Sequence, residues 1–320
     1  MNFSLLFDNL TNPAFLFFVL GVISVRLKSD LEIPANTSKF ISLYLLFSIG
    51  FKGGQELANS HFTAEIIWSI LFGIGIACLI PLYTFFILKR KFSIYDAGAI
   101  ASAYGSVSAV TFVTATSFLE MQNTAYSGHM VAVMALMEAP AIIIGVLLIQ
   151  VYSKNEVHSF DMKKLIGHSF TNGSVLLITG SLFIGLMATG KQATDIKPFT
   201  TDIFKGFLAI FLLDMGITSG RKLNDFIKNG WFAVLFAIII PLLNGCITAL
   251  LSGYITSNIG NRFILAVLAA SASYIAVPAA MKIAAPKANP GIFVPMALAV
   301  TFPFNITLGM PIYFLLIHAY

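Results

Sequence analysis

Charged residues are scarce in this chain of 320 residues. They make up 10% of it, whereas a soluble globular domain is about a quarter charged. Hydrophobic residues make up 58% and form windows of about 20 residues almost without charge, each long enough to cross a bilayer as a helix. The composition therefore excludes an ordinary soluble domain and predicts a polytopic α-helical membrane protein.

Other absences narrow the function. The two cysteines, Cys78 and Cys246, each lie in an apolar run without a partner at metal-binding spacing, which is typical of small buried hydrophobic residues. The sequence has no glycine-rich phosphate-binding loop and no Ser-His-Asp arrangement. We therefore expect neither an enzyme nor a resident cofactor or metal.

Ten apolar spans are expected, five in each half of the chain. The first half, 1–152, and the second half, 172–320, are separated by a polar cytoplasmic linker, 153–171. The expected spans are 13–25, 38–52, 66–88, 96–119, 128–152, 173–188, 203–219, 231–254, 263–283 and 291–317.

A short sequence echo links the two halves. The segment 46–57, LFSIGFKGGQEL, returns 166 positions later as 212–223, LLDMGITSGRKL, with glycines and the last leucine at matching places. Such repetition in a membrane chain is typical of transporters, because two packed repeats that rock against each other give alternating access to a site between them.

The basic residues predict the orientation. With the N-terminus outside, 14 of the 19 lysines and arginines fall in or beside cytoplasmic loops, as the positive-inside rule requires. Both termini are then expected outside the cytoplasm. Because five spans per half is an odd number, the second half enters the membrane with the opposite orientation, so the repeat is expected to be inverted.

Two spans at matching places, 96–119 and 263–283, are interrupted by small polar residues. Gly105 and Pro278 weaken their helices through backbone freedom and a missing N–H donor. A helix broken in mid-membrane exposes N–H groups that favour an anion and C=O groups that favour a cation. We expect the two breaks to cross in a core domain, although small-residue packing faces are the alternative.

Two carboxylates lie within expected spans. Glu138 is in mid-span, where an ionisable group is costly, so it is a candidate cation ligand or coupled proton site; a structural hydrogen bond is the alternative. Asp214, at the place of Ser48 in the echo, is expected either to line the path or to pair with Lys52.

Three stretches resemble the sodium-dependent bicarbonate transporter family of cyanobacteria. They are 104–111 (YGSVSAVT) with the following SFLE at 117–120, then 270–278 (ASASYIAVP), and 282–290 (KIAAPKANP). The resemblance extends along the whole membrane portion. It implies ten helices in two inverted five-helix repeats, with a core and a gate domain, assembled as a homotrimer.

The same resemblance implies site residues. Bicarbonate would bind in the first break, at Gly105, Ser106, Val107 and Ser108, with Thr111, Ser271 and Ser273 completing the shells. Sodium would be held by Ser108, Glu138, Ser273 and Tyr274. Glu138 falls where the family has an aspartate, whereas Tyr274 and Ala276 stand where it has an aspartate and a serine.

The expected function is sodium-coupled uptake of bicarbonate across the inner membrane. Transport of another small anion or monocarboxylate, driven by sodium or protons, is one alternative, and an anion channel or membrane sensor without turnover is another. A PII-like regulator is left open, because the family's long soluble insert is reduced here to a short linker.

Overall fold

The computed structural model describes residues 11–59, 63–153, 167, 171–227 and 230–320, and nearly all of them are helical. Most of the expected linker, 153–171, and residues 1–10 lie outside this description. The helices of the first half are α2 (Pro13–Arg26), α3 (Ala35–Ala58), α4 (Ala64–Leu88), α5 (Ile94–Gly105), α6 (Ala109–Met121) and α7 (His129–Tyr152).

The second half follows the same order. It contains α9 (Gly173–Met187), α10 (Gly190–Lys197), the π-helical η1 (Pro198–Asp202), α11 (Phe204–Ile227), α12 (Trp231–Leu251), the 3-10 turn η2 (Ser252–Tyr254), α13 (Ile259–Ala270) and α14 (Ala276–Ala284). A last helical run joins α15 (Pro290–Pro295), η3 (Met296–Thr301), α16 (Phe302–Phe304), η4 (Asn305–Gly309) and α17 (Met310–Ala319). Its prolines lack N–H donors, which accounts for the wider π turns of η3 and η4.

Six of the described helical stretches are long and apolar enough to cross a membrane: Ala64–Leu88, Ile94–Met121, His129–Tyr152, Gly190–Leu223, Trp231–Tyr254 and Pro290–Ala319. Three further apolar helices, α2, α9 and α13, are shorter. The one expected span that remains, 38–52, lies in α3, which is 24 residues long but carries lysine and glutamate. Length and composition thus support a multi-pass membrane protein and leave the number of ten spans a prediction.

Glycines set the closest helix contacts. A Cβ on Gly21 of α2 would collide with the backbone of α11, and one on Gly216 of α11 would collide with that of α2. Gly54 of α3 and Gly185 of α9 stand in the same relation to each other's helices. The echo glycines therefore let α3 pack on α9 and α11 pack on α2, so that each pair joins one helix from each half.

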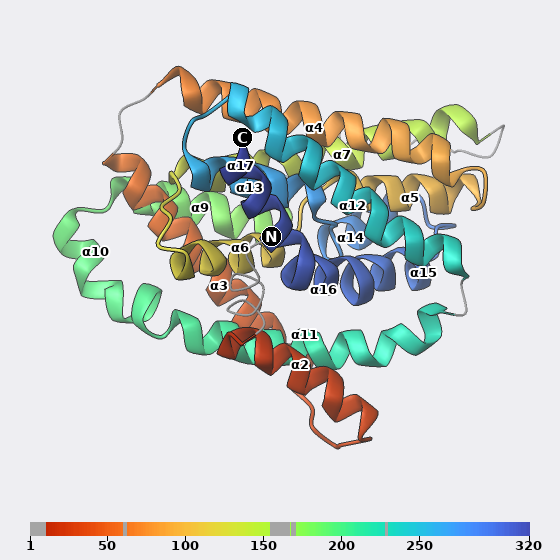
Figure 1. The fold of residues 1–320 in the computed structure, drawn as a ribbon, viewed down its shortest axis with the longest axis horizontal. Coiled ribbons are helices and arrows are strands. Elements are labelled where there is room, and N and C mark those ends of the chain that lie inside the picture. Colours follow the sequence, from red (N-terminus) through yellow and green to blue (C-terminus); the bar gives the residue numbers. More distant parts are fainter. Residues whose placement is uncertain (1–10, 60–62, 154–166, 168–170, 228–229) are drawn as a thin grey trace.

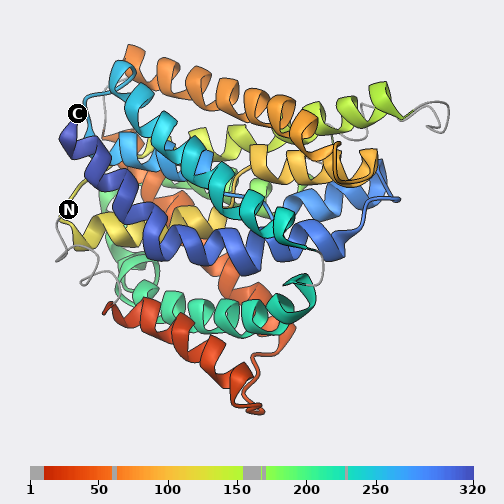
Figure 2. The ribbon, with the colours of Figure 1, turned by 45° about the vertical axis from the view of Figure 1, so that its right-hand side comes forward.

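The remaining long helices pack mainly on one another, although α7 also touches α3 and α9, and α11 touches η3 and α15. In the first half α4 packs on α5 and α7, and in the second half α12 packs on α13, η3 and α17. Figure 1 shows α4, α7, α12 and α5 along the upper side, while α2 and α11 run together along the lower side. Figure 2 shows the same separation after rotation. Of the broken helices, α6 and α14 lie between these two sides, whereas α5 lies along the upper one.

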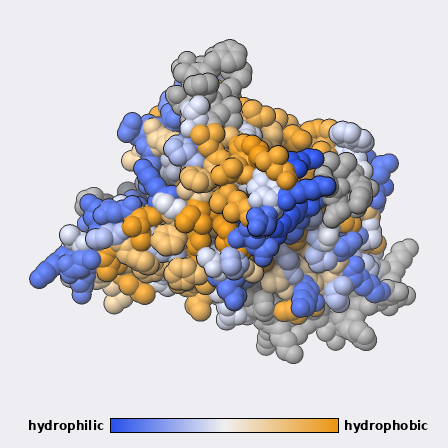
Figure 3. Space-filling view, turned by 90° about the horizontal axis from the view of Figure 1, so that it is seen from below, coloured by the Kyte–Doolittle hydropathy of each residue, from blue (hydrophilic) through white to orange (hydrophobic). Residues whose placement is uncertain are grey.

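The lower side carries an apolar surface. Helix α2 exposes Leu16, Phe17, Leu20 and Ile23 at 41–49% of their area. In Figure 3 apolar side chains gather in the middle of this face, with hydrophilic ones at its left end and in a patch right of the centre. An exposed apolar face of this kind is what lipid contact requires.

Candidate functional site

The two expected interruptions are confirmed. Helix α5 ends at Gly105, Ser106 and Ser108 have extended backbones, and α6 begins at Ala109. Helix α13 ends at Ala270, Ser271 is extended, and α14 begins at Ala276. Both breaks are buried, since Ser106, Ser108, Ser271 and Ser273 are at most 4% exposed.

Hydrogen bonds join the two breaks directly. The Ser273 N–H donates to the Ala103 carbonyl at 2.8 Å, and the Ser108 N–H donates to the Ser271 hydroxyl at 3.0 Å. The Ser271 hydroxyl in turn donates to the Leu268 carbonyl at 2.8 Å. Because these segments are about 160 residues apart in sequence, the bonds fix the crossing rather than either helix alone.

A small cavity of about 20 Å³, room for roughly one water molecule, lies at this crossing. Five of the expected site residues line it, and they come from both breaks and from α7: Val107, Ser108, Glu138, Ser273 and Tyr274. No described residue bonds the Glu138 carboxylate, through either a hydrogen bond or an ion pair. A carboxylate in this position needs a cation or a proton as its partner.

Two helix N-termini also face the cavity. Ala109, the first residue of α6, and Ala276, the first residue of α14, are among its lining residues. Ser108 caps only the Thr111 N–H of α6, at 3.2 Å, and α14 has no side-chain cap. The first N–H groups of a helix have no partner within it and carry partial positive charge. The cavity thus combines N–H groups suited to an anion with a carboxylate suited to a cation.

A larger cavity, of about 680 Å³, adjoins the small one. Ser42, Ser174, Tyr274 and Ile275 line both. The larger cavity runs between α3, α9 and α11 and contains Asp214, which accepts a hydrogen bond from the Ser38 hydroxyl. Of the two expectations for Asp214, lining a path fits the structure. Pairing with Lys52 is wrong, because Lys52 lines a different cavity with the beginning of α10.

Other expected site residues lie near the crossing without lining the small cavity. Gly105 allows close packing, because a Cβ there would meet the Pro81 ring and Ala141. Ser106 and Thr111 are buried behind the break, and the Ser106 hydroxyl has no hydrogen-bond partner among the described residues. The hydroxyl of Ser271 is already bonded within the protein, as described above.

The free carbonyl ends expected at the breaks are partly occupied. The Asn305 side-chain amide donates to the Ala270 carbonyl at 2.7 Å, and Ser273 occupies the Ala103 carbonyl. Thr301 likewise ties the last helical run to the core, donating to the Ala237 carbonyl at 2.7 Å and contacting the Tyr104 hydroxyl at 2.8 Å. These carbonyls are therefore satisfied by protein groups, which leaves Glu138 as the main negative group at the cavity.

Sequence reasoning missed the contribution of helices outside the breaks. Ser42 and Leu46 of α3 and Ser174 of α9 complete the wall of the small cavity. A serine in an apolar helix gives no signal of its own, because its hydroxyl can bond within the helix. For Ser174 the sequence gives one indirect indication, of its position at the start of a helix, because Asn172 is a typical N-cap residue.

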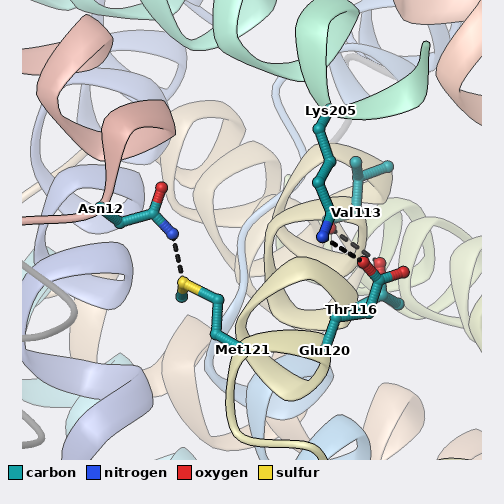
Figure 4. Close-up of polar contacts among 6 residues, drawn as sticks. All are labelled: Asn12, Val113, Thr116, Glu120, Met121 and Lys205. Atoms are coloured by element: carbon teal, nitrogen blue, oxygen red, sulfur yellow. Dashed lines mark hydrogen bonds and ion pairs between the residues drawn. The ribbon is translucent and has the colours of Figure 1, made fainter. Parts of the chain in front are cut away.

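Polar contacts join neighbouring segments at the opposite end of α6. The Lys205 ammonium of α11 lies 3.4 Å from the Glu120 carboxylate, and the Asn12 amide contacts the Met121 sulfur (Figure 4). Beside them Tyr126, in the loop after α6, is partly buried. Burial, together with the charges of Glu56 and Glu120, raises the pKa of the Tyr126 phenol. These contacts lie at the end of α6 away from the small cavity, which the first residue of α6 lines.

The apolar helices and the polar crossing at their centre are typical of a multi-pass membrane transporter. Residues 13–318 match the family model of the Na+-dependent bicarbonate transporter superfamily, and the chain belongs to that superfamily. A comparison with curated proteins found no match.

Proposed function

We propose that this chain is a secondary active transporter that couples sodium entry to uptake of bicarbonate across the inner membrane. Its anion would lie at the N-termini of α6 and α14, and its sodium ion at Glu138, with hydroxyls of Ser108 and Ser273 beside both. Superfamily membership supports the transporter class. The substrate, the coupling ion and the site residues are our proposals.

One observation carries the proposal. The unpartnered Glu138 carboxylate and two helix N-termini face the same buried cavity. An anion bound alone would be repelled by the Glu138 carboxylate, and a cation bound alone would be repelled by the partial positive charge of the helix N-termini. Together the two ions neutralise each other in a region of low dielectric. A fully loaded site is therefore easier to carry across the membrane than a half-loaded one, and this difference is the physical basis of coupling.

We further propose that ten spans form two inverted repeats, 1–152 and 172–320. The packing supports this arrangement. Helix α3 (span two) packs on α9 (span six), and α11 (span seven) packs on α2 (span one). A two-fold axis that exchanges the two repeats converts the first pair into the second. The same axis relates α4 and α7 to α12 and the last helical run. These four helices and the two broken ones form the proposed core domain, and α2, α3, α9 and α11 the gate domain.

The proposed orientation places both termini outside, the 680 Å³ cavity on the cytoplasmic side and the Lys205–Glu120 contact on the outer side. The structure would then be inward-facing. Arg262, counted in the sequence among the outer basic residues, is a weak guide to orientation. It is 8% exposed and donates to the Ala249 carbonyl at 3.1 Å, near the end of α12.

Uptake of labelled bicarbonate into proteoliposomes tests the proposal. We expect uptake to require an inward sodium gradient. An inside-negative potential should stimulate it only if more than one sodium ion enters with each bicarbonate, because each net charge moved is worth about 2.3 kcal/mol per 100 mV. Uptake that is unchanged when sodium is replaced by choline would exclude sodium coupling. Proton coupling would show instead as uptake driven by a pH gradient.

Two partners stay predictions of the family resemblance: two further copies in a homotrimer, and a PII-like regulator that would act from the cytoplasmic side. The lipid bilayer, expected from the composition, agrees with the superfamily and the apolar helices. The second candidate substrate is another small anion or monocarboxylate. The neutral Tyr274 favours it, since a phenol leaves one carboxylate at the cavity. Competition of acetate or formate with labelled bicarbonate distinguishes the two substrates.

A further inference from the structure

Tyr274 occupies a singular place between the two cavities. It is the fourth residue of the break between α13 and α14, and it lines both the 20 Å³ cavity and the 680 Å³ cavity. Three other residues, Ser42, Ser174 and Ile275, share this boundary, but two of them are small. Tyr274 has the largest side chain of the four.

The Tyr274 side chain is anchored on both sides of this boundary. Its hydroxyl lies near the Ser108 side chain in the other break and 3.8 Å from the Met215 sulfur of α11. Its ring packs edge-on against Phe302, with the centroids 6.4 Å apart. One side chain thus spans from the crossing to a helix of the proposed gate domain.

The size of the small cavity requires a movement. About 20 Å³ holds roughly one water molecule, which is too little for bicarbonate together with a sodium ion. The two anchors of the phenol are weak ones, a neutral hydroxyl and a thioether sulfur. The 680 Å³ cavity next to the ring provides the space into which it can move.

We propose that Tyr274 is the inner gate of the site, standing between Glu138 and the 680 Å³ cavity and swinging into that cavity to let ions pass. This inference rests on the proposed function for the identity of the ions, but not for the closure itself. It makes Tyr274 a positioning residue, because its ring controls access while other groups hold the ions.

Carbodiimide labelling of Glu138 tests the closure without any transport measurement. A water-soluble carbodiimide is added to the whole protein in inside-out vesicles, and modified Glu138 is followed by peptide mass spectrometry. We expect Tyr274→Ala to raise the labelling rate about tenfold or more, since an open minor state is typically 0.1–10% populated. Tyr274→Phe keeps the ring and should stay within about twofold of wild type on the same population argument.

Tyr254→Ala, at a tyrosine that is 89% exposed, is the matched control and should label as wild type does. An unchanged rate in Tyr274→Ala, or an equal rise in Tyr274→Phe and Tyr274→Ala, would overturn the proposal that the ring is the barrier. Sodium efflux from proteoliposomes without bicarbonate gives a second readout, and we expect it to rise in Tyr274→Ala alone. If the protein carries neither sodium nor bicarbonate, the labelling result still decides the closure.

Discussion

Glu138→Gln is the substitution that most sharply separates a cation ligand from a structural residue. The side chain faces the cavity at the crossing and has no partner among the described residues. Glutamine has the same shape and keeps one carbonyl oxygen, but it loses the charge. Packing is therefore preserved, and the change in sodium dependence reports the charge.

The magnitude follows from Coulomb's law. A carboxylate and a sodium ion about 4 Å apart attract by about 4 kcal/mol at an effective dielectric constant of about 20. Desolvation of the two ions offsets part of this attraction, and we take the remainder as about 2 kcal/mol. At about 1.4 kcal/mol per factor of ten, the half-saturating sodium concentration should rise roughly thirtyfold in Glu138→Gln.

The assay is initial bicarbonate uptake in proteoliposomes as a function of sodium concentration. Sodium-dependent thermal stabilisation of the purified protein gives a second measure that needs no turnover. Asp195→Asn, at an exposed carboxylate of α10, is the matched control and should leave both curves unchanged. Glu138→Asp should fall between wild type and Glu138→Gln. Wild-type sodium dependence in well-folded Glu138→Gln would refute the reasoning.

Two other predictions concern the crossing and the outer contact. Ser108→Leu should abolish uptake while the protein still folds and reaches the membrane, because the side chain fills a cavity of about 20 Å³; normal uptake at wild-type expression would place the site elsewhere. Glu120→Gln removes an ion pair whose side chains are 42% and 69% exposed, which is worth only about 0.5 kcal/mol. The readout is the rate at which an outside thiol reagent labels Ser117→Cys in a cysteine-free background, and we expect this rate to change roughly twofold. Glu120→Lys, which sets two like charges at Lys205, should accelerate labelling further, and an unchanged rate there would count against an outer closure.

Much of the fold could be predicted because membrane helices leave strong local signals. Long apolar runs gave helices close to the expected positions, and Gly105 marked the first break correctly. Pro278, expected to weaken the second helix, instead lies in the first turn of α14, after the break at 271–275, where a missing N–H costs no helical hydrogen bond. The structure explains two glycines of the echo: Gly54 and Gly216 each lie where two helix backbones touch. A pattern of small residues thus predicts close approach well, without saying which helix approaches.

The site was harder to predict because it depends on contacts between distant segments. Sequence alone could not show that Asn305 would bond the Ala270 carbonyl and Ser273 the Ala103 carbonyl, which removes two expected cation ligands. It also could not show that Gly105 faces Pro81, because a glycine signals backbone freedom and close packing in the same way.

Tyr274 illustrates the same limit. In the sequence Tyr274 stands where the sodium-dependent bicarbonate transporters have an aspartate, and the resemblance implies that it binds sodium. In the structure it fills the boundary between two cavities, where its size matters as much as its hydroxyl. Bulk at a boundary is visible only when both sides of the boundary are known.

A density map of the protein in lipid nanodiscs with sodium and bicarbonate tests the central claim most directly. The account predicts a planar anion at the N-termini of α6 and α14, a cation at Glu138, and the ring of Tyr274 displaced toward the larger cavity. A map at the same salt that shows an empty crossing, with ordered ions bound elsewhere, would contradict it.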